Sequence, residues 1–161
     1  MSSPVHHPRI IVASLLLTLA GCVHSNELSF ESETACLMND VQSIAIDIEV
    51  ARSSEQRQQG LMGRTTLGKT DGMLFVYKDK RPPSHTFWMR NTLIPLDIAF
   101  IDSSGTIRAI NTMEPCSNDV LRCPTYPAGA SFTLALEMNK GYFAQNGFAV
   151  GHRFALNDIC Q

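Results

Sequence analysis

The chain has 161 residues, of which 44% are hydrophobic, and its formal net charge at pH 7 is −2. This length and composition are sufficient for one globular domain with a core of its own. A slightly acidic chain without a cluster of basic residues is not expected to bind nucleic acid.

Residues 1–21 have the order of features found in a cleaved lipoprotein signal peptide. Arg9 supplies a positive charge, residues 10–20 form an apolar run, and Leu19-Ala20-Gly21-Cys22 resembles a lipobox. The run is shorter than the about 20 residues of a transmembrane helix, but its length suits a secretory signal. We therefore expect lipidation of Cys22 after export. The alternative is an ordinary signal peptide that ends near a cysteine.

The residues after Cys22 bear on where the protein resides and where its domain begins. Val23, rather than aspartate, follows the cysteine, which by similarity to known sorting signals favours the outer membrane, facing the periplasm. The lipid would attach the protein to the membrane, since no second apolar run approaches spanning length. Residues 22–39 are polar and aperiodic, and we expect a lipidated terminus and flexible tether. Residues 40–161 are expected to form a single domain.

The first predicted elements are a strand and a short helix. Isoleucine or valine occupies every second position from Ile44 to Val50, the pattern of a half-buried strand. Ser53 and Gln56 then have the spacing of a capping box. This spacing predicts a short helix that ends at Gly60.

The rest of the chain consists of short apolar runs between turn signals. Residues 102–105 (Asp-Ser-Ser-Gly) predict a hairpin, and a helical turn is expected after Gly141. Residues 132–138 alternate as a half-buried strand does. The other predicted strands are 73–77, 87–89, Leu96–Ile101, 106–113 and 148–155. Many short strands and one or two short helices favour a mainly β fold, a compact jelly-roll-like sandwich or a partly closed barrel.

Four cysteines follow Cys22, and in an exported protein an even number indicates disulfides. Three pairings are possible. We favour Cys116 with Cys123, which closes a short loop, and Cys36 with Cys160, which joins the start of the domain to its end. The alternative, a metal or redox site, is disfavoured because Cys116 and Cys123 do not have CxxC spacing.

Three segments place charged groups among apolar residues. Residues 60–64 put Arg64 just after the predicted helix. Residues 87–92 (Phe-Trp-Met-Arg-Asn-Thr), followed by Asp97, combine an indole, a guanidinium, an amide, a hydroxyl and a carboxylate. Residues 135–138 put Glu137 on an otherwise apolar strand.

These segments and their neighbours resemble, in order and spacing, the family named domain of unknown function (DUF) 192. The matched blocks are residues 60–64, 72–75, 87–92, 95–99, 135–137 and Gly151, spread over residues 44–154. The resemblance implies a compact, mainly β domain of the jelly-roll-like kind. It implies no established reaction, cofactor or substrate. The lipobox and the four cysteines are not part of the family pattern.

Arg64, Trp88, Arg90, Asn91 and Asp97 are the candidate ligand-binding residues. Arginine binds carboxylates and phosphates with two parallel hydrogen bonds, and the indole of tryptophan stacks on planar groups. The other interpretation, which we favour for the two arginines and the tryptophan, is structural. The two arginines would pair inside the fold with Asp97 and Glu137, and the tryptophan would belong to the core.

Asp97 and Glu137 are also weak candidates for a catalytic carboxylate pair of the glycosidase kind, which requires a separation of roughly 5–10 Å. No cofactor and no metal site are expected, because His85 and His152 stand apart from other ligands. Five scattered methionines are interpreted as core residues rather than copper ligands.

Three hypotheses follow. We favour a non-catalytic binding or accessory module, anchored at the envelope, for a small polar or anionic ligand or an envelope protein. The second is a hydrolase of envelope glycans or related substrates. The third is a purely structural lipoprotein.

Overall fold

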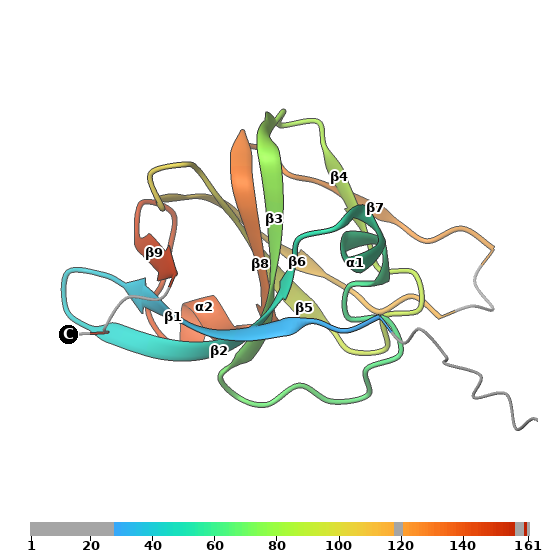
Figure 1. The fold of residues 1–161 in the computed structure, drawn as a ribbon, viewed down its shortest axis with the longest axis horizontal. Coiled ribbons are helices and arrows are strands. Elements are labelled where there is room, and N and C mark those ends of the chain that lie inside the picture. The colour runs from blue at the N-terminus through green and yellow to red at the C-terminus, as the bar shows by residue number, and fades with distance from the viewer. Residues whose placement is uncertain (1–27, 118–120, 157–159, 161) are drawn as a thin grey trace, which may run out of the picture.

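The structure is a computed structural model that describes residues 28–117, 121–156 and 160. Short strands dominate it, with two short helices (Figure 1). In chain order the elements are β1 (Glu31–Met38), β2 (Ser43–Ala51), α1 (Ser54–Gln59), β3 (Asp71–Arg81), β4 (Thr86–Trp88), β5 (Leu96–Ile101), β6 (Ile107–Met113), β7 (Thr125–Pro127), β8 (Phe132–Asn139), α2 (Tyr142–Gln145) and β9 (Arg153–Leu156).

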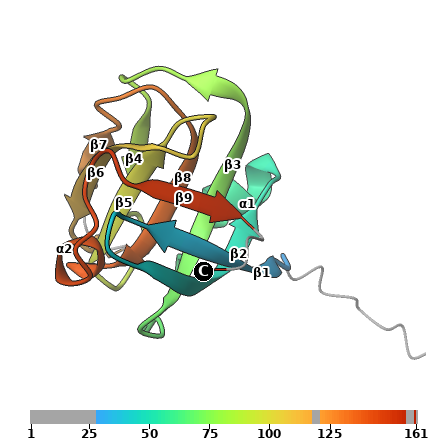
Figure 2. The ribbon, with the colours of Figure 1, turned by 90° about the vertical axis from the view of Figure 1, so that its left-hand side faces the viewer.

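Seven strands form one sheet in the order β6-β5-β8-β3-β2-β1-β9, and β4 and β7 form a separate two-stranded sheet. Neighbours in the large sheet are antiparallel except β2 and β3, which are parallel. The large sheet curls, so that β9 lies across from β8 (Figure 2). The expected mainly β fold is confirmed.

The two edges of the large sheet meet beside the hairpin of residues 102–105. Thr106 bridges Arg153, and the amide of Phe154 donates to the carbonyl of Gly105 at 2.8 Å. Gly105 has a φ of 82°, and a Cβ atom there would lie 2.5 Å from the carbonyl oxygen of Phe154. Glycine is therefore required for this approach. The contact is local, and the result is a partly closed barrel.

Two cores lie on opposite faces of the curled sheet. The inner core receives residues from all seven strands and is covered by α2 through Tyr142 and Phe143. The outer core lies on the other face of β3, β5 and β8, beneath Leu61 and beneath Phe87 of β4. The outer face, which would otherwise meet water, is thus covered by a second layer made of α1 and the β4–β7 sheet.

Most predicted elements are present. β2, the 102–105 hairpin and α1 are confirmed, and α1 has both hydrogen bonds of the capping box between Ser53 and Gln56. The expected tether is wrong for Glu31–Met38, because these residues form β1, which pairs with β2 and β9. The predicted strand 148–155 begins only at Arg153, and β7 was not predicted.

Both favoured disulfides are present, Cys36–Cys160 and Cys116–Cys123, with Cα–Cα distances of 5.6 and 5.8 Å. The predicted signal peptide and Cys22 lie outside the described residues. Within the described part of the chain, no helix is long and apolar enough to cross a membrane.

Candidate functional site

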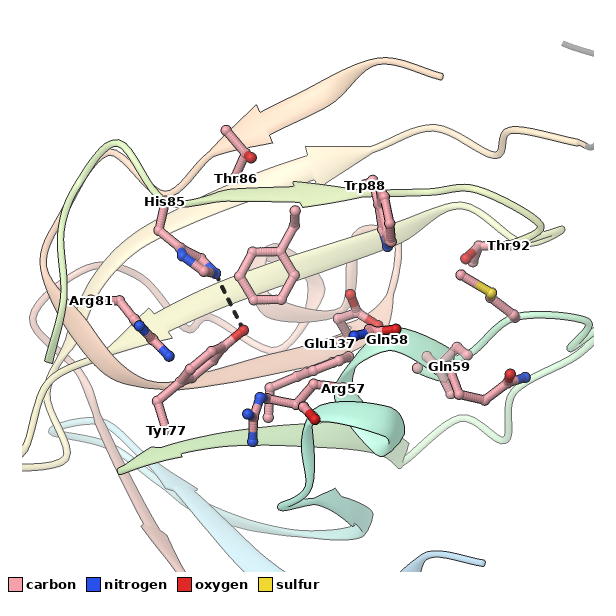
Figure 3. A pocket seen from close by; sticks show the side chains of 16 residues that line it. Arg57, Gln58, Gln59, Tyr77, Arg81, His85, Thr86, Trp88, Thr92 and Glu137 are labelled. Atoms are coloured by element: carbon pink, nitrogen blue, oxygen red, sulfur yellow. Dashed lines mark hydrogen bonds between the residues drawn. The ribbon is translucent and has the colours of Figure 1, made fainter. Parts of the chain in front are cut away.

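A pocket of about 370 Å³ lies between α1, the end of β3 and β4, above the outer face of β8 (Figure 3). In this view Arg81, Tyr77 and His85 lie at one end of the pocket, Trp88 and Thr92 lie at the other, and Glu137 lies between them. The volume is within the range of small-molecule sites.

Helix α1 forms one side of the pocket, and its local sequence fixes where it begins and ends. The side chain of Ser53 accepts from the amide of Gln56, and the Gln56 side chain accepts from the amide of Ser53. The helix ends at Gly60, whose φ is 47° and where a Cβ atom would lie 3.3 Å from the ring of Phe75. Glycine allows this close approach of the helix end to β3. Arg57 and Gln58 of the same helix line the pocket.

Aromatic rings form the walls. Phe75 and Phe87 contact edge to face with ring centroids 5.4 Å apart, and His85 packs on Phe87 at 5.7 Å. The hydroxyl of Tyr77 lies 3.4 Å from Nε2 of His85. Trp88, whose exposed fraction is 51%, stands at the rim. Such walls suit a flat, largely apolar ring.

Two guanidinium groups, those of Arg57 and Arg81, give one end of the pocket a positive charge. Each lies over the ring of Tyr77, 4.9 Å from its centroid. Neither forms an ion pair with a carboxylate of the described residues, and Nε of Arg81 is buried without a hydrogen-bond partner there. Burial, and then the charges of Arg81 and Arg57, lower the pKa of His85. This histidine is therefore neutral at pH 7 and adds no charge of its own.

Glu137 lies at the base of the pocket, in the middle of β8. It stands between Met73 of β3 and Ile98 of β5 in the sheet register, and its exposed fraction is 4%. No hydrogen bond or ion pair to its carboxyl group is found among the described residues. Burial raises the pKa of Glu137 to about 8. The carboxyl group is consequently protonated at neutral pH and can donate a hydrogen bond.

Asp97 does not lie in this pocket. It alternates along β5 with Leu96 and Ile98 of the outer core, so its side chain lies on the opposite face from that of Glu137. The hydroxyl of Thr112 and the amide of Gly141 donate to its carboxylate at 2.7 and 2.8 Å. The expectation of a carboxylate pair acting on one substrate is therefore corrected, because successive side chains of a strand point to opposite faces.

The expected internal pairing of Arg64 and Arg90 with Asp97 and Glu137 is also wrong. Arg64 pairs with Glu49 of β2 instead, at 2.5 Å, and Arg90 is exposed. The alternative that placed Trp88 in the core is wrong as well.

Trp88, Arg90 and Asn91 come together around a groove next to the pocket. Asn91 has a φ of 58°, and its Oδ1 atom is buried without a partner among the described residues. Trp88 lines both the groove and the pocket. The structure thus unites three of the five candidate ligand-binding residues and leaves out Arg64 and Asp97.

The pocket residues that were not among the candidates include Arg57, Tyr77, Arg81 and His85. Arg57 lies on α1, whereas Tyr77 and Arg81 lie near the end of an eleven-residue strand. They meet because β3 is long enough to reach past the helix. The sequence signal that marks this end is the Pro82-Pro83 break, which ends β3 and returns the chain as β4.

A larger hollow, of about 630 Å³, lies beside the 102–105 hairpin. Two of its charged groups are engaged with each other, since Nε of Arg108 pairs with Asp102 at 2.6 Å. The third, Lys80, is exposed. Among the described residues no group of three or more His, Cys, Asp or Glu side chains could hold a metal ion.

Comparison with known proteins identifies the family. The sequence profile of DUF192, described as an uncharacterized ACR, matches residues 36–156. The chain belongs to the DUF192 family. The match confirms the resemblance seen in the sequence and includes Cys36, at the centre of β1.

Two solved structures are similar to this DUF192 protein. One, a Sinorhizobium meliloti 1021 protein provisionally named a transcription regulator, is 31% identical with a TM-score of 0.70, over 81% of this chain and 97% of that one. The other, a protein of unknown function from Novosphingobium aromaticivorans DSM 12444, is 32% identical with a TM-score of 0.65, over 75% of this chain and 82% of that one. No curated protein matches the DUF192 chain.

Proposed function

We propose that this DUF192 protein is a non-catalytic binding module that takes a small, ring-bearing organic anion into the pocket between α1 and β4. The observation that carries the proposal is the pair of guanidinium groups, Arg57 and Arg81, which lack a carboxylate partner among the described residues at the end of an aromatic-walled pocket. Both arginines are half-buried, and a bound anion would supply the counter-charge that partly desolvated guanidinium groups favour.

The two guanidinium groups differ in their freedom to bind. Nη1 of Arg57 donates to the backbone carbonyls of Arg52 and Val76, at 2.5 and 3.1 Å, which holds its side chain in place. No hydrogen bond of the Arg81 side chain is found among the described residues, and its Nε is buried. A carboxylate in the pocket would accept from the two terminal nitrogens of Arg81, with the two parallel hydrogen bonds that guanidinium groups favour.

The pocket favours binding over hydrolysis. Of the residues that the structure describes, Glu137 is the only acidic one that lines the pocket. The second carboxyl group proposed for hydrolysis, that of Asp97, lies on the opposite face of the sheet. A glycosidase-type reaction requires two carboxyl groups at one bond.

Calorimetric titration of the full chain, solubilised in detergent, with benzoate tests the proposal. Benzoate should bind more tightly than uncharged benzamide, and Arg81→Gln should weaken benzoate binding at least about tenfold through the lost charge-assisted hydrogen bonds. Arg108→Gln is the matched control, because Arg108 is exposed and paired with Asp102, and it should leave binding unchanged. Equal affinity for both probes, or equal loss in both variants, would contradict the proposal.

We further propose that the protein is a lipoprotein attached through Cys22 to the outer membrane, facing the periplasm. The order of charge, apolar run and Leu19-Ala20-Gly21-Cys22 supports this. Cys22→Ser should block processing and move the protein out of the detergent phase in phase partitioning. A Cys22→Ser variant that is processed and partitions as wild type does would refute the lipid anchor.

A further inference from the structure

Glu137 is a buried polar group at the base of the pocket that the binding of an anion does not use. It lies on β8 beneath α1 and β4, and its carboxyl group has no partner in the described structure. A ligand that fills the pocket covers this carboxyl group completely. The hydrogen-bonding needs of the carboxyl group therefore restrict which ligands the pocket can bind.

The groups around Glu137 determine which form of the carboxyl group the pocket holds. The strands on either side, β3 and β5, place apolar Met73 and Ile98 beside it. The titratable and charged groups that face the pocket are Tyr77 and Arg81 of β3, His85 before β4, and Arg57 of α1; neither guanidinium comes within ion-pair distance of Glu137. An ionised carboxylate here would be desolvated without an adjacent counter-charge.

Resting on the proposed function, we propose that the Glu137 carboxyl group donates its O–H to an uncharged oxygen of the ligand, so that the site selects ring-bearing anions with a second, neutral hydrogen-bond acceptor such as a carbonyl. The pKa of Glu137, raised by burial to about 8, agrees with this protonated form. The anionic group lies at the end of Arg81, and the acceptor lies over β8.

Two other ligand classes fit the same carboxyl group less well. An amine would require ionised Glu137 and would share the pocket with two guanidinium groups that repel it. A hard metal ion requires several oxygen ligands, and in the described part of the chain the carboxyl group of Glu137 is the only one that lines the pocket.

Matched probes test the selection. The acetyl and isopropyl groups of 4-acetylbenzoate and 4-isopropylbenzoate have the same number of non-hydrogen atoms and the same branching, and both molecules are anions, but only the acetyl group accepts a hydrogen bond. The full chain should bind 4-acetylbenzoate about tenfold more tightly at pH 6.5, since the isopropyl group leaves the buried donor unpaired. The preference should shrink as the pH rises beyond 8, where Glu137 loses its proton.

Two variants of Glu137 test whether a hydrogen-bond donor at this position causes the preference for 4-acetylbenzoate. Glu137→Leu keeps the volume and removes the donor, so both probes should bind equally. Glu137→Gln keeps an N–H donor and cannot ionise, so it should keep the preference and make it independent of pH. Melting curves of each variant show that it folds.

The outcomes separate this inference from the proposed function. Equal binding of both probes to the wild-type protein, still dependent on Arg81, would overturn the selection and leave the anion site standing. A preference that survives Glu137→Leu, or that is lost in Glu137→Gln, would also overturn it. Failure of every benzoate to bind would overturn both.

Discussion

A glutamate in the middle of a strand ordinarily faces water, whereas Glu137 lies under α1 and β4 with no counter-charge. Its burial makes the stability of the fold depend on pH. The pKa in the folded state, about 8, lies above the ordinary value of 4.5. Between these two values the folded state therefore holds a proton that the unfolded state has released.

The sign of the effect follows from this difference. The stability contributed by protonated Glu137 is complete below pH 4.5 and is lost as the pH rises through about 8. Relative to Glu137→Gln, the free energy of unfolding of the wild-type protein should fall by at most about 1.4 kcal/mol per pH unit over this window. Urea titrations of both proteins from pH 5 to 9 measure the difference, and His85 titrates in both. Parallel stability curves would show that Glu137 is ionised or solvated in the folded protein.

Single residues also show what sequence reasoning could reach. Trp88, Arg90 and Asn91 were singled out as a cluster of functional groups on one strand and its exit, and Glu137 as a carboxylate on an apolar strand. The structure places all four in the pocket or the adjoining groove. Asp97 breaks its strand in the same way, but it binds Thr112 and Gly141 across the inner face. The two carboxyl groups that interrupt apolar strands, those of Asp97 and Glu137, are thus both buried, and the face on which each is buried depends on register.

At the scale of elements, the sequence predicted those strands and helices whose pattern lies within the element itself. The alternation from Ile44 to Val50 predicted β2, and the spacing of Ser53 and Gln56 predicted α1 with its cap. β1 was missed because its outer half, Glu31–Thr34, is polar and largely exposed, and only Ala35, Cys36 and Leu37 are buried. Its pairing with β9, at the other end of the domain, leaves no local signature.

The strand β8 was predicted to be half-buried, yet both of its faces are covered. Leu136 and Met138 face the inner core, and Ala135 and Glu137 face the second layer. The parts of that layer that flank the pocket, α1 and β4, come from residues more than forty positions earlier in the chain, so alternation alone could not reveal the cover. The pocket exists because this cover over β8 is incomplete.

The Cys116–Cys123 disulfide supports the same layer. The amide of Cys116 donates to the carbonyl of Thr92 at 3.2 Å, directly after β4, and Cys123 precedes β7, the partner of β4. The bridge thus holds both strands of the small sheet at the end where Trp88 pairs with Thr125.

In the whole molecule, the inner core that stabilises the fold and the pocket that we propose binds a ligand lie in different layers. The curled seven-stranded sheet encloses the inner core and is fastened by the Cys36–Cys160 disulfide and by the contact of Gly105 with Phe154. The second layer on its outer face leaves the pocket open between α1 and β4. Changes in the pocket can therefore alter what the protein binds with limited effect on the inner core.

The central claim is that the pocket between α1 and β4 is the ligand site, and the chain has one tryptophan, at its rim. In a ¹⁵N NMR titration with 4-acetylbenzoate, the single indole N–H signal of Trp88 should shift together with the amides of Thr86, Thr92 and Glu137. The amides of Arg108 and Lys140, which lie outside the pocket, should not move. Shifts that cluster around Arg108 and Ser131, in the larger hollow, or no shift at saturating probe, would contradict the claim.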